Sequence, residues 1–400
     1  MHQGPPRRTL IVTNDFPPRA GGIQTFVWEL AVRQPPGSVV VYASRSEGWR
    51  DFDAAAPFPV VRDRATMLLP TPRVAAGAAA ALREHGCTAV WFGATAPLGL
   101  LGAGLRAAGA QRIVATTHGH EVGWARLPGP RQLLRRIGRQ VDVVTVLGEY
   151  TRQRLQSAFG AGRPGGPQLA RLAPGVDPDR FAPTPAAELD GRYLRARHGI
   201  AADAPVLLCV SRLVPRKGQD ALIAALPAVL AELPGARLVL VGRGRDEGRL
   251  RALARRHGVQ DAVVFAGAVA DAELPGYYAL ASAFAMPCRT RRAGMDVEGL
   301  GIVFLEASAA GLPVIVGDSG GAPDAVLDGR TGRLVEGRDQ SAIEQAAIAL
   351  LADSGRAARL GAAGREWVGR EWTWDRSAAR LRELLDAGPA GPAQSAGDPA

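Results

Sequence analysis

Short continuous apolar runs alternate with amphipathic segments along most of the chain. Runs of four or five apolar residues are typical of strands that a parallel sheet buries on both faces. In the first half the predicted strands are Thr9–Thr13, Val39–Tyr42, Ala89–Phe92, Ile113–Thr116 and Val143–Val146. Helical spacing of apolar residues follows at Ile23–Ala31, Val74–His85 and Arg131–Arg139. This alternation predicts a doubly wound α/β domain.

A second series of the same kind begins at Val206–Val210. Its further predicted strands are Arg237–Val241, Val263–Phe265, Ala283–Met286 and Val314–Val316. Its predicted helices are Ala221–Leu230, Arg249–His257, Leu274–Leu280 and Phe304–Ala310. The pattern predicts an α/β fold of two Rossmann-like, doubly wound parallel-sheet domains facing a cleft. Ligands in such sheets bind beyond the carboxyl ends of the strands, so we expect the active site there.

The domain limits follow from composition. Prolines accumulate between Asp177 and Asp203, which predicts a linker. We expect an N-terminal domain over residues 1–187 and a C-terminal domain over residues 188–370. A C-terminal helix over 371–387 is expected to pack back on the N-terminal domain. Residues 388–400 are mostly Gly, Pro, Ala, Ser and Gln, and are expected to be a disordered tail.

Composition narrows the class of protein. The chain is 47% hydrophobic and 22% charged, values that exclude a mainly disordered protein. No apolar run approaches the roughly 20 residues that span a bilayer, and a short polar N-terminus precedes the first strand. We therefore expect a cytoplasmic protein. Cys87, Cys209 and Cys288 have no metal-binding spacing, so they are expected to be buried thiols in a reducing compartment.

The charge is uneven and contains one anomaly. The net charge is +10, of which the first 190 residues carry +8 from 22 arginines against 14 acids. Such an excess favours phosphate-rich partners: nucleotides, anionic lipid headgroups or nucleic acid. Among 48 basic residues, Lys217 is the one lysine. Because lysine supplies a compact point charge that arginine does not replace, Lys217 marks a candidate functional position.

Two loops carry candidate phosphate-binding groups. Arg212 and Lys217 flank a proline turn after the strand Val206–Val210, just before a helix, and two cations there suit a diphosphate. Gly21 and Gly22 precede the first helix, where backbone N–H groups could approach an anion. A third glycine-rich turn, at Gly242–Gly244, misses the dinucleotide-binding fingerprint by one residue. A nicotinamide enzyme is therefore disfavoured.

Carboxylates and a histidine complete the candidate site. Glu298 lies in a glycine-rich loop and Glu306 lies one turn into the next helix, with seven residues between them. Carboxylates at this spacing can hydrogen-bond two sets of hydroxyls along one polyol ligand. His118 follows a strand of the first domain and points into the expected cleft, although a structural role would be the more common explanation for a lone histidine.

Together these segments resemble glycosyltransferase family 4, retaining enzymes of the GT-B fold. The resemblance extends from Thr9 to about Leu385. Within the family it is closest to the actinobacterial enzymes that transfer mannose from GDP-mannose to the 6-position of inositol in phosphatidylinositol monomannoside. The segments that carry it are NDFPPRAGGIQ, TTHGHE, WARLPGPRQLLRRIGR, SRLVPRKGQD, MPCRTR and DVEGLGIVFLEASAAGLPVIVGDSGGAPDAV.

The resemblance implies a role for each candidate residue. Arg212 and Lys217 would hold the GDP diphosphate, Glu306 the ribose, and the backbone at Val269 the guanine. Glu298 and His118 would contact the mannose as catalytic residues, and Gly21 and Gly22 would line the phosphate region. No cofactor or metal is expected, since Arg and Lys would neutralise the leaving phosphate. The alternatives are another family 4 transferase with a different donor or lipid and, more remotely, a module that binds anionic phospholipid.

A glycolipid acceptor implies work at a membrane surface. Arg131, Arg135, Arg136 and Arg139 alternate with Leu133, Leu134 and Ile137, a pattern typical of an interfacial helix or of a core-packed helix with a basic outer face. Arg62, Arg64, Arg73 and Arg83 form a second basic candidate. We expect peripheral binding at the inner face of the plasma membrane, and no nucleic-acid partner because stacked strand aromatics are absent.

Overall fold

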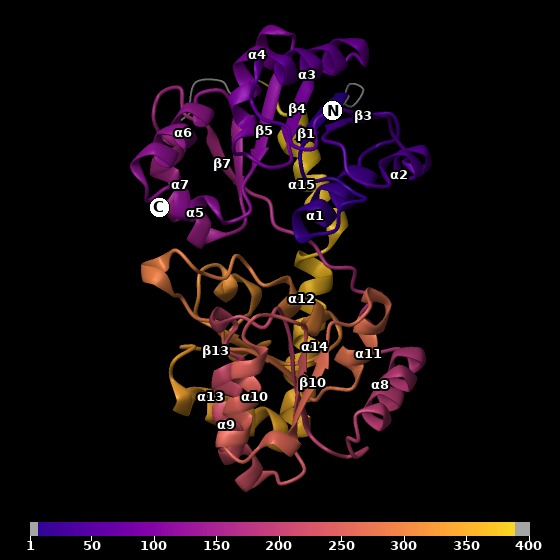
Figure 1. Cartoon of the computed structure of the whole chain (residues 1–400), viewed down its shortest axis with the longest axis vertical. Helices are drawn as coiled ribbons and strands as arrows, with labels where there is room; N and C mark the ends of the chain where they lie inside the picture. The colour runs from indigo at the N-terminus through magenta and orange to yellow at the C-terminus, as the bar shows by residue number, and fades with distance from the viewer. Residues whose placement is uncertain (1–6, 389–400) are drawn as a thin grey trace, which may run out of the picture. The chain divides into compact units, whose positions relative to one another are not determined.

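The computed structural model describes residues 7–388 and divides into two compact units (Figure 1). The first unit contains the chain up to Pro174 together with the segment from Trp374 onward, and the second contains Gly175–Thr373. Each unit is a parallel sheet with helices on its faces. The prediction of two Rossmann-like domains is thereby confirmed. Among residues 7–388, no helix combines the length and apolar character needed to cross a membrane.

The first unit contains a seven-stranded parallel sheet in the order β3-β2-β1-β4-β5-β6-β7. Its strands are β1 (Thr9–Thr13), β2 (Val39–Ala43), β3 (Val60–Arg62), β4 (Ala89–Phe92), β5 (Arg112–Thr116), β6 (Val143–Val146) and β7 (Gln168–Arg171). Its helices are α1 (Gly22–Val32), α2 (Trp49–Ala55), α3 (Pro72–Glu84), α4 (Gly102–Ala107), α5 (Glu121–Trp124), α6 (Pro128–Gly138), α7 (Glu149–Phe159) and α15 (Trp374–Asp386). The central strands β1, β4 and β6 are buried throughout, so apolar side chains on both faces form the core.

The second unit contains a six-stranded parallel sheet in the order β10-β9-β8-β11-β12-β13. Its strands are β8 (Val206–Val210), β9 (Arg237–Val241), β10 (Val263–Gly267), β11 (Ala283–Met286), β12 (Val314–Gly317) and β13 (Gly332–Val335). Its helices are α8 (Pro185–Arg197), α9 (Gln219–Glu232), α10 (Glu247–Arg256), α11 (Leu274–Ala279), α12 (Ile302–Ala309), α13 (Gln340–Ala352) and α14 (Ser354–Glu371). The strand order reverses direction between β8 and β11, and this is where such sheets bind ligands.

The boundary between the units differs from the expected one at residue 187. The chain enters the second unit at Gly175, and the predicted linker contains helix α8, which packs against α11. The prolines misled the sequence interpretation, because Pro185 occupies the first turn of α8 behind the N-cap Thr184. Proline is favoured there, since its missing N–H has no partner within the helix.

The last helix belongs to the first unit. Helix α15 packs against α1, β4 and β5, and buries Trp374, Leu381 and Leu384. The guanidinium of Arg112, on β5, donates to the carbonyl of Leu384 at 2.9 Å. The predicted tail, residues 388–400, lies outside the described residues from 389 onward.

Candidate functional site

The loop that leaves β8 places two candidate phosphate ligands beside the sheet reversal. A single 3-10 turn, Pro215–Lys217, ends at Gly218, which has a φ of +81°. A Cβ on Gly218 would lie 2.1 Å from the carbonyl oxygen of Pro287, so only glycine allows this approach of the loop after β11. Two loops, one from each strand that flanks the reversal, are therefore held together.

Lys217 and Glu298 form a buried ion pair in these loops. The Nζ atom of Lys217 lies 2.6 Å from Oε2 of Glu298, and the side chains are 10% and 8% exposed. The Nε atom of Arg216 lies 3.8 Å from the same oxygen and 3.6 Å from Oδ1 of Asp296. The residue expected to bind the diphosphate, Lys217, is thus a direct neighbour of Glu298, the residue expected to bind the sugar.

The Asp318–Gly321 segment holds Glu298 in place. The N–H of Gly321 donates to the Glu298 carbonyl at 2.9 Å, and the N–H of Glu298 donates to Oγ of Ser319 at 3.4 Å. A Cβ on Gly320 would lie 2.1 Å from the Glu298 carbonyl oxygen. Gly320 and Gly321 therefore let the backbone after β12 pack directly against the loop that carries Glu298.

Glu306 lies on α12 with a different set of partners. Its Oε2 accepts a hydrogen bond from the Tyr278 hydroxyl at 2.7 Å. Burial raises the pKa of the Glu306 carboxyl above its ordinary value, and the Tyr278 hydroxyl and Arg180 partly offset this effect. Glu298 and Glu306 thus lie in different environments, which is consistent with different ligands for each.

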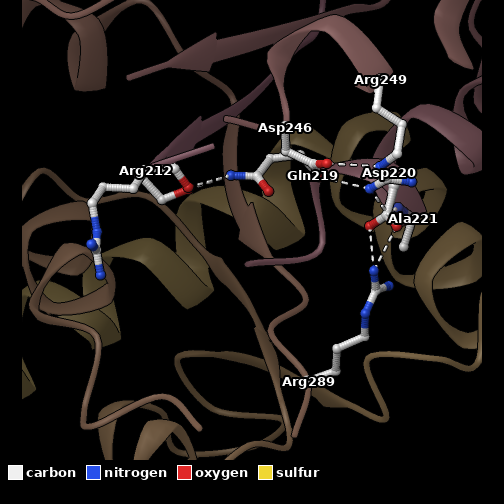
Figure 2. A network of polar contacts seen from close by, with 8 residues as sticks. Arg212, Gln219, Asp220, Ala221, Asp246, Arg249 and Arg289 are labelled. Carbon is white, nitrogen blue, oxygen red and sulfur yellow. Dashed lines mark hydrogen bonds and ion pairs between the residues drawn. The ribbon is translucent and has the colours of Figure 1, made fainter. Parts of the chain in front are cut away.

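Arg212 presents its guanidinium without a protein partner within residues 7–388. Its carbonyl accepts from the Gln219 amide at 3.0 Å, while Figure 2 shows its side chain pointing away from the cluster around Asp220. An exposed, unpaired guanidinium beside the Lys217 loop is available to an anion.

The glycine turn after β9 has a packing role. Cβ atoms on Gly242 and Gly244 would lie 2.1 Å from the carbonyl oxygens of Ser211 and Leu213, respectively. These glycines therefore let the turn lie against the backbone around Arg212. Val269 follows the end of β10 and is half-buried.

In the first unit, the candidate glycines lie at the start of α1. Gly21 is the N-cap residue with a φ of +157°, and a Cβ on it would lie 2.3 Å from Oε1 of Gln24. The Gln24 amide also donates to Asp15 at 2.9 Å. A Cβ on Gly22 would meet open space, so no packing constraint requires glycine there.

His118 follows β5 and is fixed by two contacts. Its Nε2 lies 2.7 Å from the Gly93 carbonyl, an acceptor, so Nε2 carries the proton. The ring of Phe26 meets the imidazole edge-on at 5.4 Å. Burial lowers the pKa of His118, so the ring is neutral and Nδ1 is left as an acceptor.

Helix α6 has its apolar side in the core. Leu134 and Ile137 are fully buried in the main cluster of the first unit, whereas Arg131, Arg135, Arg136 and Arg139 are exposed. The core-packed alternative is therefore the observed one, with the arginines on the outer face of the helix.

Two of the four arginines in the second basic candidate pair with carboxylates, whereas Arg64 and Arg83 are exposed. Arg62 is 2% exposed and pairs with Asp53 at 2.8 Å, and Arg73 pairs with Asp63 at 2.8 Å. All three cysteines are buried free thiols, as predicted. Within the described residues, His, Cys, Asp and Glu do not gather in a group of three that could hold a metal.

The structure brings together some predicted residues and adds others. Arg212, Lys217, Glu298 and Glu306 surround the reversal of the second sheet, whereas Gly21, Gly22 and His118 follow strands of the first. Sequence reasoning missed Arg216, Tyr278 and Ser319 as partners of the two carboxylates. Arg216 adjoins Lys217 in the segment SRLVPRKGQD. No feature of the sequence around Tyr278 identifies it as a partner of Glu306, which follows 28 residues later.

Two family models match this chain and cover both sheets. "Glycosyltransferase Family 4" matches residues 20–180 and "Glycosyl transferases group 1" matches residues 192–367. In the solved structure of Anabaena HepE in complex with UDP, the fold is similar: the TM-score is 0.77, with 19% identity over 94% of this chain and 99% of that chain. The two Rossmann-like units have the fold of the GT-B glycosyltransferases, and the chain belongs to glycosyltransferase family 4.

Similarity to named enzymes indicates where in family 4 this chain belongs. The Mycobacterium tuberculosis GDP-mannose-dependent alpha-(1-6)-phosphatidylinositol monomannoside mannosyltransferase is 52% identical over 94% of this chain and 98% of its own length. The Corynebacterium glutamicum enzyme, named for the monoacylated acceptor, is 47% identical over 96% of this chain and 99% of its own length. Within family 4, this chain therefore groups with the actinobacterial mannosyltransferases.

Proposed function

We propose that this chain transfers mannose from GDP-mannose to the 6-position of the inositol ring in phosphatidylinositol monomannoside, with retention of configuration. The buried pair of Lys217 and Glu298, at the reversal of the second sheet, is the observation that carries the proposal. It places a point charge suited to a phosphate 2.6 Å from a carboxylate suited to sugar hydroxyls. The bond that breaks in the transfer is the one between the mannose and the diphosphate of the donor.

Each site residue then has one role. Arg212 and Lys217 bind the diphosphate and stabilise the charge that grows on it as the bond to mannose C1 breaks. Glu298 accepts hydrogen bonds from mannose hydroxyls, and Glu306 accepts them from the ribose. The backbone at Val269 meets the guanine, and Gly21 and Gly22 line the phosphate region.

His118 positions the sugar. With its Nε2 proton on the Gly93 carbonyl, Nδ1 can accept a hydrogen bond from a mannose hydroxyl. The acceptor hydroxyl oxygen bonds to C1 on the face from which GDP departs, and its proton passes to the leaving phosphate. This step uses no cofactor or metal, because Arg212 and Lys217 supply the positive charge.

The transfer assay uses labelled GDP-mannose with purified phosphatidylinositol monomannoside. We expect a product with one additional mannose, no comparable transfer from UDP-glucose, and loss of product in Lys217→Ala. Equal use of UDP-glucose, or no transfer by a folded wild-type protein, would show that the donor or acceptor is wrong. Arg255→Gln, an exposed change on α10, is the matched control and should retain activity.

The acceptor also implies a membrane surface, which we propose is the inner face of the plasma membrane. The exposed arginines of α6 would bind anionic headgroups at about 1 kcal/mol each, less at high salt. Replacing Arg131, Arg135, Arg136 and Arg139 by Gln should lower sedimentation with phosphatidylinositol vesicles and leave GDP affinity unchanged. Binding that is independent of salt, or equal for neutral vesicles, would contradict this assignment.

A further inference from the structure

A hollow in the second unit is lined by cations and lies among helices. It has a volume of about 430 Å³, within the range of roughly 300–1,000 Å³ for small-molecule sites. Helices α9, α10 and α13 form its walls, with α9 in contact with both of the others. The lining residues are Asp220, Ala221, Ala224, Arg249, Leu253, Arg256, His257, Arg289, Gly337, Arg338 and Gln340.

Four arginines and one aspartate line this hollow, and two of the arginines contact the aspartate. Asp220 accepts from Nη2 of Arg289 at 2.5 and 2.7 Å and from Arg249 at 3.2 Å (Figure 2). Arg249 is also fixed by Asp246 at 2.7 Å. Burial alone would raise the pKa of Asp220, but the two arginines lower it below its ordinary value. Asp220 is therefore ionised, and Asp220 and Asp246 together offset two of the four positive charges.

Some guanidinium N–H groups in the hollow have no acceptor within the described residues. Within residues 7–388, the Arg256 guanidinium has no partner and Arg289 uses one nitrogen only. Arg338 donates from Nη2 to the Thr290 carbonyl at 2.9 Å, which holds it at the rim. The Arg289 side chain is only 15% exposed, so its guanidinium lies partly out of solvent. A partly desolvated guanidinium binds an anion more strongly than a fully exposed one does.

We propose that this hollow is a second anion site, separate from the Lys217–Glu298 site, for a small soluble ligand that carries two or more phosphate charges. Guanidinium forks match phosphate oxygens in pairs, and the two uncancelled cations favour a ligand with at least two negative charges. The small side chains of Ala221 and Ala224 leave the space that it fills. Two loops connect the sites, since the Arg289 N–H donates to the Arg216 carbonyl at 2.9 Å.

The test is calorimetric titration of the full chain with inorganic pyrophosphate in the presence of saturating GDP. We expect pyrophosphate binding to persist, and Arg256→Gln to weaken it by about tenfold, the effect of losing one charged hydrogen-bond donor. Ala224→Phe should abolish binding by filling the hollow without removing charge. Arg255→Gln, the neighbouring exposed arginine outside the hollow, should bind as the wild type does. Melting temperatures establish that each variant is folded.

Several results would overturn the proposal: no binding of pyrophosphate, displacement by GDP, equal weakening in Arg255→Gln, or normal binding by Ala224→Phe. Phosphatidylinositol vesicles distinguish a lipid headgroup from a soluble phosphate. Ala224→Phe should leave vesicle sedimentation unchanged. Loss of sedimentation in this variant would show that the hollow binds a lipid headgroup and would overturn the proposal of a soluble ligand. GDP is also titrated alone, so that failure of GDP to bind counts against the proposed donor site and not against the second site.

Discussion

Lys217→Ala tests the buried ion pair most directly. The change removes the cation 2.6 Å from Glu298 and leaves a carboxylate that is 8% exposed. Breaking a buried pair from one side costs about 3–5 kcal/mol. Arg216, whose Nε lies 3.8 Å from the same oxygen, retains part of the attraction, so we expect the low end, about 3 kcal/mol.

That loss should be visible in thermal unfolding. For a unit of roughly 200 residues, 1 kcal/mol shifts the melting temperature by about 2–4 °C, so Lys217→Ala should melt about 6–12 °C lower. The double variant Lys217→Met with Glu298→Gln removes both charges and should recover more than half of the difference. A single variant that melts within about 2 °C of the wild type would refute the buried pair.

Turnover should fall separately from stability. At 20 °C, where the variant is folded, loss of a phosphate contact in the transition state should lower kcat/KM by about 30- to 1,000-fold. Lys217→Arg should also lose activity, since the planar guanidinium does not reproduce the ammonium. Unchanged kcat/KM in Lys217→Ala would remove this residue from the diphosphate site, whatever its effect on melting.

Three further predictions concern the groups around this pair. Glu298→Gln should lower kcat strongly and leave calorimetric GDP affinity within about threefold, whereas Glu306→Ala should weaken GDP by about tenfold; equal losses would contradict the division of roles. Gly320→Ala should lower stability by about 1–3 kcal/mol and reduce turnover, because its φ is +61° and its Cβ would strike the Glu298 carbonyl, while Gly329→Ala, with a φ of +73° in open space, should keep turnover. Because burial lowers the pKa of folded His118, the unfolded state binds more protons below pH of about 6.5, and the protein should lose melting temperature on acidification from pH 7.5 to 5.5; His118→Gln should lose less, and an equal loss would show that His118 is not the group responsible.

The sequence predicted the central strands well because their burial is continuous. Strands β1, β4, β6 and β8 have the predicted bounds, since neither face meets water and every residue is apolar or small. The edge strands β3, β7 and β13 were missed. They are short and partly exposed, so their polar residues carry no strand signal; β7 reads Gln-Leu-Ala-Arg.

For the site, the sequence selected candidate residues but could not predict which of them touch. The lone lysine and the spacing of Glu298 and Glu306 were sufficient to select the candidates. That Lys217 pairs with Glu298 depends on two loops separated by 80 residues of chain meeting across the sheet reversal. Arg62 shows the converse limit: its charge suggested an exposed patch, but Asp53 draws it into the interior. Pairing of distant charges is a property of the tertiary structure.

Helix α15 has a consequence for how the protein is made. The first unit is not finished when its seven strands have left the ribosome, because the side chains that cover α1, β4 and β5 come from Trp374–Asp386. Roughly 200 residues of the second unit are translated in between, which takes about 10–40 s at 5–20 residues per second. During that time the nascent first unit exposes an apolar strip to the cell's chaperones. The first unit therefore begins synthesis before the second unit but completes its fold after it.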